Sequence, residues 1–281
     1  MTRVPRWRTR LLQLWLPLGF FLLTGLAPFY WMLITSLKPN AELYNRRIMP
    51  LVVYHPTLKH YVDLLTETSF LTWTWNTTLV AVTSTAISLV LGIMLAYPLA
   101  RMRFAGAGLI AATVAATYLV PQPLLFIPLA DIINRLGLYD TLTAVILTYP
   151  TMLVPFCAWL LIGYFKTVPR ELEEAARIDG ANRFQTMTRV VLPLCIPGFI
   201  SAGIFAFTLS QNEFLYALIF LTKTDVRTVP VGAIAELIRG DVFYWGQLMA
   251  AALLGSLPVA FLYSFFVEHY VAGLTAGSVK G

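Results

Sequence analysis

The sequence is poor in charge and rich in apolar residues. Only 12% of its 281 residues are charged, whereas 58% are hydrophobic and the mean hydropathy is +0.72. Because soluble domains average about 25% charged residues, this composition indicates a membrane protein. The net charge of +6 is dispersed along the whole chain, so we expect no binding to nucleic acid.

The sequence also has little of what metal sites, disulfides and enzyme centres need. Cys157 and Cys195 both lie in apolar surroundings, so no disulfide framework is expected. The three histidines have no zinc-ligand spacing with these cysteines, and no cluster of His, Asp or Ser near one membrane face indicates an enzyme. The motif G-x-x-x-x-G-K-[ST] is missing, so the chain has no such loop to hold ATP. We therefore expect no catalytic residue, metal or cofactor on this chain.

Long uncharged runs predict an all-α integral membrane protein, with one transmembrane domain over residues 1–281. A helix needs about 20 mostly apolar residues to cross a bilayer. Six intervals meet this need: residues 12–34, 78–99, 107–130, 142–165, 197–221 and 247–267. Four arginines between residues 3 and 10 precede the first interval. Its apolar run is too long for a cleaved signal peptide, so we expect a retained signal anchor.

The basic residues predict that both termini face the cytoplasm. With that orientation, the cytoplasmic segments hold twelve basic and five acidic residues, whereas the outer segments hold eight of each. An excess of Lys and Arg marks the cytoplasmic side of a membrane protein. The outer segment 38–77 is rich in aromatic residues, which predicts an interfacial belt or, alternatively, contact with an external partner. The aromatic residues in question are Tyr44, Tyr54, Tyr61, Trp73 and Trp75.

The cytoplasmic segment 166–196 is the most highly charged part of the chain, and its pattern predicts a helical hairpin. Three glutamates between residues 171 and 174 favour a helix N-terminus. Gly180 tolerates the left-handed conformation that ends a helix. Asn182, with Gln185 three residues later, is typical of a capping box that starts the next helix. The second helix is expected to end near Pro193, where the chain re-enters the membrane.

The hairpin matches a known pattern at seven fixed positions. Glu174-Ala175-Ala176, Gly180, Val190 and Leu192-Pro193 fit EAA-x3-G-x9-I-x-LP, with Val at the Ile position. The segment resembles the loop by which membrane subunits of bacterial ABC importers, which have the type I permease fold, dock into a cleft on the ATP-hydrolysing subunit. An ordinary solvated hairpin is the alternative. The resemblance implies these docking residues: Glu174, Ala175, Ala176, Asp179, Gly180, Leu192 and Pro193.

Three further segments resemble the carbohydrate-uptake branch of that family. They are Asn212-Glu213-Phe214, residues 228–232 and the tail 272–281, which is especially similar to the maltose-permease G-type subunit. Gln211 departs from the pattern, since many relatives have Trp before the Asn. The resemblance implies a transport subunit for a sugar, polyol or related solute in the bacterial inner membrane. By the same resemblance, the tail is expected to reach the ATPases.

The resemblance also implies partners. They are a second, related permease chain, two ATPase subunits that bind ATP and Mg²⁺, an extracytoplasmic solute-binding protein and the surrounding membrane lipid. A self-contained carrier driven by an ion gradient is the alternative function. Such a carrier needs coupling-ion sites. A single carboxylate within the predicted spans is little evidence for them.

Four polar residues of the predicted spans are candidates for the solute path. Glu213 is the only ionisable residue well inside a span, and such residues usually mark a function. Gln211 and Asn212 beside it suit sugar hydroxyls, although the cluster could instead hold helices together. Gln122 lies between two prolines, where a broken helix could line a cavity or simply be kinked. Asn76 and Thr77 are expected to be helix caps.

Overall fold

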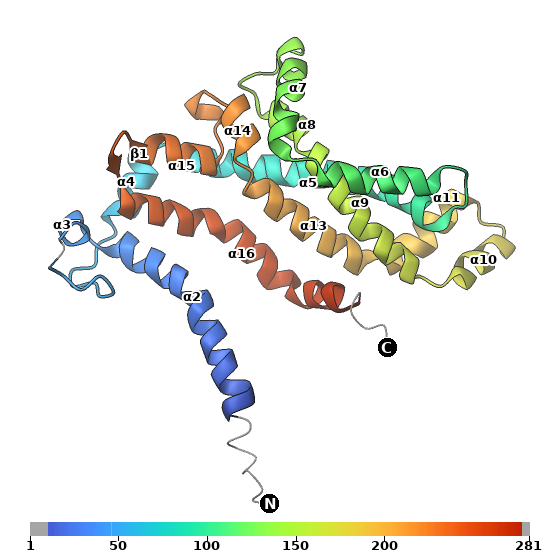
Figure 1. Ribbon diagram of the computed structural model, residues 1–281, viewed down its shortest axis with the longest axis horizontal. Helices are drawn as coiled ribbons and strands as arrows, with labels where there is room; N and C mark the ends of the chain where they lie inside the picture. Colours follow the sequence, from blue (N-terminus) through green and yellow to red (C-terminus); the bar gives the residue numbers. More distant parts are fainter. Residues whose placement is uncertain (1–10, 46, 277–281) are drawn as a thin grey trace, which may run out of the picture. The chain divides into compact units, whose positions relative to one another are not determined.

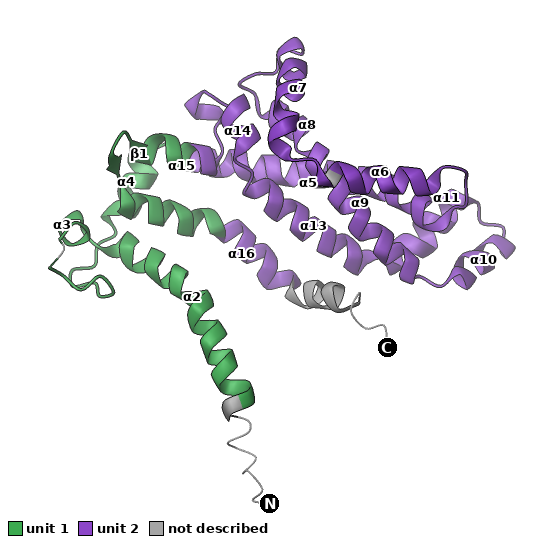
Figure 2. Cartoon of the chain, viewed as in Figure 1, with its two compact units in different colours: residues 1–70, 232–256 green, residues 71–231, 257–281 purple. Residues whose placement is uncertain are grey.

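The computed structural model describes residues 11–45 and 47–276, which are almost entirely helical (Figure 1). The N-terminal arginines predicted to precede a signal anchor and the last five residues of the tail lie outside the described residues. The contacts divide the chain into two units (Figure 2). Unit 1 comprises residues 1–70 and 232–256, and unit 2 comprises residues 71–231 and 257–281.

Unit 1 is built from short elements around the predicted outer segment. It contains η1 (Leu11–Trp15), α2 (Leu16–Leu37), α3 (Asn40–Leu43), α4 (Lys59–Glu67), β1 (Ile238–Arg239), β2 (Val242–Phe243) and the start of α16 (Trp245–Ala276). Strands β1 and β2 are antiparallel, with Ile238 paired to Phe243. Helices α5 (Phe70–Arg101) and α15 (Val229–Leu237), like α16, have residues in both units.

Unit 2 holds most of the remaining helices. They are α6 (Ala107–Leu119), α7 (Gln122–Arg135), α8 (Leu142–Thr148), α9 (Pro150–Thr167), α10 (Arg170–Ile178), α11 (Arg183–Thr186), η2 (Met187–Val191), α12 (Leu192–Leu194), α13 (Ile196–Gln211), α14 (Leu215–Phe220) and η3 (Thr224–Val226). Four helices of the described chain are long and apolar enough to cross a membrane, and the count reaches six if each of two bent pairs is one span.

The helix bounds differ from the predicted spans where the chain bends. The second span is longer than predicted, because α5 starts at Phe70 rather than near residue 78. The third is broken where the prolines predict it, since α6 and α7 meet at 96°. The fifth is not one helix over 197–221: α13 ends at Gln211 and α14 is separate. Helix α16 continues to Ala276, so the first five residues of the predicted tail are helical.

The outer segment 38–77 is folded by specific polar contacts. Glu42 is buried and accepts hydrogen bonds from the N–H groups of Tyr54 (3.2 Å) and His55 (2.8 Å). His60 Nε2 lies 2.8 Å from the Lys38 carbonyl oxygen. A Cβ at Gly246 would lie 2.3 Å from the His60 ring, which explains the glycine at the second position of α16. These contacts hold α3, α4 and the start of α16 together within unit 1.

One of the aromatic residues expected at the membrane interface belongs to the core instead. Trp73 is fully buried, and its Nε1 donates to the Thr224 carbonyl oxygen at 2.9 Å. The expectation for Trp73 was wrong because α5 starts earlier than predicted and places the ring inside unit 2. Tyr44, Tyr54 and Trp75 are exposed, as an interfacial residue requires.

Asn76 and Thr77 are not caps of α5, because they are its seventh and eighth residues. Asn76 Nδ2 donates to the carbonyl oxygens of Asp225 (2.8 Å) and Arg227 (3.0 Å). The Thr77 hydroxyl accepts from the Val229 N–H at 2.8 Å, at the first residue of α15. The two side chains therefore fasten the segment between α14 and α15 to α5.

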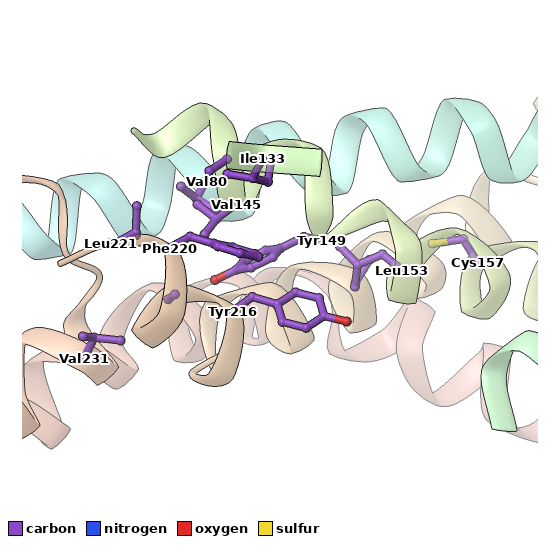
Figure 3. Packing of buried hydrophobic residues seen from close by; sticks show 13 residues of the cluster. Val80, Ile133, Val145, Tyr149, Leu153, Cys157, Tyr216, Phe220, Leu221 and Val231 are labelled. Carbon is purple, nitrogen blue, oxygen red and sulfur yellow. The ribbon is translucent and has the colours of Figure 1, made fainter. Parts of the chain in front are cut away.

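The core of unit 2 has two parts. In the first part, side chains from α5, α7, α8 and α14 converge with Tyr149, which lies between α8 and α9 (Figure 3). They include Val80, Ile133, Val145, Tyr149, Tyr216 and Phe220. The second part lies where α5 and α9 end, and there the rings of Tyr97 and Phe165 pack edge to face. Helices α9 and α13 approach closely at Gly198, where a Cβ would lie 2.5 Å from the Tyr164 ring. Small residues permit such close packing of membrane helices.

Asp140 connects the loop before α8 to the loop after α14. Its Oδ1 accepts hydrogen bonds from the N–H groups of Thr222 (2.6 Å) and Lys223 (3.1 Å), and its own N–H donates to the Phe220 carbonyl oxygen (2.9 Å). Asp140 has a φ of +57°, a conformation that Asp and Asn tolerate better than most residues. Burial raises the pKa of Asp140, but the hydrogen bonds from Lys223 and Thr222 outweigh it, so the pKa lies below its ordinary value.

We expect Asp140→Asn to lower the free energy of unfolding by up to about 1 kcal/mol at neutral pH, since charged acceptors bind more strongly than amides. The depressed pKa means that this contribution is present above the unfolded pKa, about 3.9, and is lost as pH falls through the folded pKa. Thermal unfolding of both proteins between pH 7 and pH 3 checks this: the two midpoints should converge below about pH 4. A constant difference would contradict it. Asp131→Asn, whose ion pair with Arg135 is exposed, is the control.

Candidate functional site

The predicted hairpin presents its motif residues to solvent. Helix α10 starts after Pro169, and Glu174, Ala175, Asp179 and Gly180 are all exposed. Ala176 and Leu192 are half-buried, and Pro193 is exposed. The structure thus gathers the five predicted docking residues 174–176, 179 and 180 at one end of the hairpin and places the Leu192–Pro193 pair after it.

Large apolar side chains surround the motif without being covered. Ile178 is 86% exposed and Phe184 is 69% exposed, and Leu172 is also exposed. Such residues normally mark a contact with another protein or with the membrane when they gather in one place. No sequence motif indicates Phe184, which lies between the two capping-box residues and belongs to α11 rather than to the EAA pattern.

The turn of the hairpin has the geometry that its sequence predicts. Gly180 has a φ of +86°, and the Ala181 N–H donates to the Ala176 carbonyl oxygen at 2.9 Å. The side chains of Asn182 and Gln185 each accept from the other residue's N–H at 2.9 Å, which confirms the capping box. A left-handed glycine closes α10 and a reciprocal cap opens α11.

The second arm of the hairpin ends near Pro193, as predicted. Helical turns continue from α11 through η2 and α12 to Leu194, and the break falls at Cys195. Residues 183–194 and α13 then meet at 74°. Pro193 sits in the first turn of α12, where its missing N–H is tolerated. The bend therefore follows the Leu-Pro pair by two residues.

A buried ion pair fastens the hairpin to the ends of two spans. Arg101, the last residue of α5, donates from Nε to Glu173 of α10, and the two side chains are only 4% and 10% exposed. Arg101 Nη1 donates to the Phe165 carbonyl oxygen of α9 at 3.1 Å, and the Tyr97 hydroxyl donates to Glu173 at 3.5 Å. No sequence motif indicates this ion pair, because Arg101 and Glu173 are 72 residues apart in the chain.

The polar residues proposed for the solute path differ in exposure. Gln211 and Glu213 are buried, whereas Asn212 and Gln122 are exposed. Gln122 borders a cavity of about 400 Å³ that Thr151, Met152 and Leu209 also line. Its carbonyl oxygen accepts from the Tyr216 hydroxyl of α14 at 3.5 Å. The structure thus brings Gln122 near the helix that follows Glu213.

Glu213 caps a helix. Its carboxylate accepts from the N–H groups of Tyr216 (2.9 Å) and Ala217 (3.2 Å), in the first turn of α14. A carboxylate at this position satisfies free N–H groups and complements the helix dipole. These contacts favour a structural role for Glu213, which is the alternative that the sequence left open.

We therefore expect Glu213→Ala and Asn212→Ala to differ. Glu213→Ala removes the cap and should cost about 1–2 kcal/mol of stability, because lost caps cost that much. Asn212→Ala removes an exposed amide whose Nδ2 donates to the Thr208 carbonyl oxygen, and should reduce solute uptake at an unchanged thermal midpoint. Uptake and thermal unfolding of both purified variants check this. Normal uptake by Asn212→Ala would remove Asn212 from the solute path.

No group of three or more His, Cys, Asp or Glu side chains is placed to hold a metal ion within residues 11–45 and 47–276. Both cysteines are buried and free.

Comparisons with known proteins match nearly the whole chain. A family model described as binding-protein-dependent transport system inner membrane component matches residues 88–275. The chain is 40% identical over 266 residues to the inner membrane ABC transporter permease protein YcjP of Escherichia coli, covering 94% of each. It is 39% identical over 264 residues to the sulfoquinovosyl glycerol transport system permease protein SmoH of Agrobacterium fabrum, covering 94% of this chain and 92% of SmoH.

A third relative and two solved structures are also similar to the chain. The trehalose/maltose transport system permease protein MalG of Thermococcus litoralis is 35% identical over 259 residues, covering 91% of this chain and 92% of MalG. A bacterial ABC transporter involved in the import of alginate superposes with a TM-score of 0.78 at 21% identity, over 96% of this chain and 99% of that one. The MetNI methionine ABC transporter gives 0.58 at 19% identity, over 76% and 97%. These likenesses show the type I permease fold.

Proposed function

Because the chain belongs to the family of inner membrane components of binding-protein-dependent transport systems, we propose that it is a permease subunit of an ATP-driven importer for a sugar, polyol or related solute. It crosses the inner membrane and performs no chemistry on the solute. ATP and Mg²⁺ are bound by a separate ATPase chain, whose cycle moves the permease between outward-open and inward-open states.

The observation that carries this proposal is the exposed hairpin with its buried attachment. Its outer side offers Ile178, Phe184 and the EAA residues to a partner. Its inner side is held by Glu173 to Arg101, and Arg101 in turn holds the Phe165 carbonyl oxygen. A displacement of α10 by a docked ATPase would therefore be passed directly to the cytoplasmic ends of α5 and α9.

The proposed complex contains a second permease chain, two ATPase subunits and an extracytoplasmic binding protein. Relatives named as sugar permeases support the solute class: SmoH is named for sulfoquinovosyl glycerol and MalG for trehalose and maltose. Exposed amides at Gln122 and Asn212 are suitable partners for sugar hydroxyls, since an amide both donates and accepts hydrogen bonds. The residues that select one solute would then include these two.

The contacts of Glu213 weigh against the ion-driven alternative. A carrier of that kind needs a carboxylate free to bind its coupling ion. Glu213, the only ionisable residue well inside a predicted span, has its carboxylate occupied by two backbone N–H groups of α14. The chain offers no comparable second carboxylate within the spans.

Copurification tests the proposal. We expect the tagged chain, expressed with its neighbouring transport genes, to retain an ATPase subunit through detergent extraction. Ile178→Asp should abolish this retention, because it places a charge on an exposed apolar contact. The control is Thr188→Asp, which places the same charge on the second arm of the hairpin and should leave the ATPase bound. A chain isolated without any ATPase, yet active in ion-driven uptake, would overturn the proposal.

A further inference from the structure

An arginine-rich pocket lies between the end of α5 and the hairpin. Its volume is about 430 Å³. Two glutamates, Glu173 and Glu174, line it, but they are outnumbered by basic residues. The five arginines of its lining are Arg101, Arg103, Arg170, Arg177 and Arg183. Within the described chain the pocket thus holds an excess of positive charge that its own carboxylates do not neutralise.

Hydrogen bonds inside the pocket leave part of this charge unsatisfied. Arg101 uses Nε for Glu173 and Nη1 for the Phe165 carbonyl oxygen. Its Nη2 is buried and has no hydrogen-bond partner among the described residues. Glu173, the buried carboxylate, is already engaged by Arg101 and Tyr97. A buried guanidinium with unused donors favours an anion beside it, because an unsatisfied charged group is costly.

The pocket lies at the ends of two candidate membrane spans. Arg101 is the last residue of α5, and Phe165, whose carbonyl oxygen Arg101 binds, is two residues before the end of α9. Both helices are long and apolar enough to cross a membrane. Basic pockets between spans on the cytoplasmic side attract anionic headgroups, and arginine forks suit phosphate oxygens.

We propose that this arginine pocket binds a phosphate group, carried by an anionic lipid of the inner leaflet or by free phosphate. The inference rests on the proposed function for its orientation, since it requires the hairpin to be cytoplasmic. Arg101 ends α5 and Arg103 follows it, whereas Arg170, Arg177 and Arg183 belong to the hairpin. A phosphate bound by arginines of both segments would therefore join the docking hairpin to the end of α5 and hold the two in a fixed relative position.

Lipid binding to the assembled, delipidated transporter tests the site. Native mass spectrometry would count retained molecules during titration with phosphatidylglycerol, with phosphatidylcholine, and with inorganic phosphate. We expect phosphatidylglycerol to bind and phosphatidylcholine not to bind. Arg103→Gln combined with Arg183→Gln should weaken phosphatidylglycerol binding about tenfold or more, since each basic residue near a membrane surface contributes measurably to attraction of anionic lipid. Arg189→Gln, an exposed arginine of the same hairpin outside the pocket lining, should leave binding unchanged.

The titrations with lipid and with inorganic phosphate distinguish between the two possible sources of the phosphate group. Binding of inorganic phosphate alone, with the same loss in the double variant, would support a site for free phosphate. Equal binding by wild type and the double variant would overturn the site. Binding by the isolated chain that disappears in the assembled transporter would also overturn it, because the ATPase would then cover the pocket. Binding is measured without turnover, so a failure of ATP-driven uptake would be seen separately.

Discussion

Gly180→Val is expected to reduce ATP-driven uptake strongly, by about tenfold or more, while leaving the spans folded. The φ of +86° at Gly180 is strained for a residue with a Cβ and most strained for a β-branched one. Valine would cost about 1–2 kcal/mol if the turn kept its shape. The turn avoids that cost by rotating, which breaks the hydrogen bond from Ala181 to Ala176 and re-aims α11 relative to α10. The exposed docking residues would then no longer form one surface.

The consequence for transport should be large, because docking requires both arms at once. We expect uptake by reconstituted transporter to fall by about tenfold or more, which corresponds to about 1.4 kcal/mol of lost docking energy. ATP hydrolysis that no longer responds to solute would accompany this loss. Uptake and ATPase rates measured on the same vesicles check the prediction.

Two control variants distinguish a change in the shape of the hairpin turn from the effect of backbone strain elsewhere in the chain. Gly180→Asn should retain most activity, since Asn tolerates the left-handed conformation. Gly137→Val introduces the same kind of strain in a loop outside the hairpin, where φ is +66° and a Cβ would likewise meet nothing within 4 Å. Gly137→Val should leave coupling intact. If Gly180→Val also transports normally, Gly180 is only a loop residue.

Glu173→Ala should destabilise the protein more than any single change on the surface of the hairpin. It leaves the guanidinium of Arg101 buried without its counter-charge, and breaking a buried pair in this way costs about 3–5 kcal/mol. The side chains are 4% and 10% exposed, so solvent screens the pair little. We expect a clear drop in the thermal midpoint of the purified complex, together with loss of the attachment between α10 and α5.

The neighbouring glutamate provides a matched control. Glu174 is exposed and belongs to the predicted docking set, so Glu174→Ala should weaken ATPase retention at an unchanged thermal midpoint. Removing both partners, with Arg101→Ala added to Glu173→Ala, should cost less than the sum of the single changes, because no charge is then left buried alone. Equal midpoints for Glu173→Ala and Glu174→Ala would contradict the assigned roles.

Local chemistry predicts the hairpin well. A glycine that ends one helix and a reciprocal Asn–Gln cap that starts the next act over a few residues, and both are in place at Gly180 and Asn182. The proline pair beside Gln122 likewise predicts the break between α6 and α7. Apolar run length predicts where membrane helices lie, but uncharged polar residues such as Asn76 can extend a helix beyond its apolar core, as in α5.

Contacts between distant segments are what the sequence does not reveal. Arg101 reads as one more basic residue at the cytoplasmic end of a span, and only the fold brings Glu173 to it. Thr77 and Asn76 read as caps of their own helix but bind the backbone of residues 225–229. Their expected role was local, whereas their partners lie in a distant segment. Glu213 reads as a carboxylate for a solute path, and the break after α13 places it where it caps α14.

The central claim is that a separate ATPase drives this permease through the hairpin. The most direct test measures solute uptake by proteoliposomes. These vesicles contain the purified chain, its partner permease and the ATPase, and the binding protein is added outside. ATP enclosed in the vesicles should drive solute accumulation, and Ile178→Asp should abolish it although the spans remain inserted. Accumulation without ATP in response to an imposed proton or sodium gradient, unaffected by Ile178→Asp, would contradict the account.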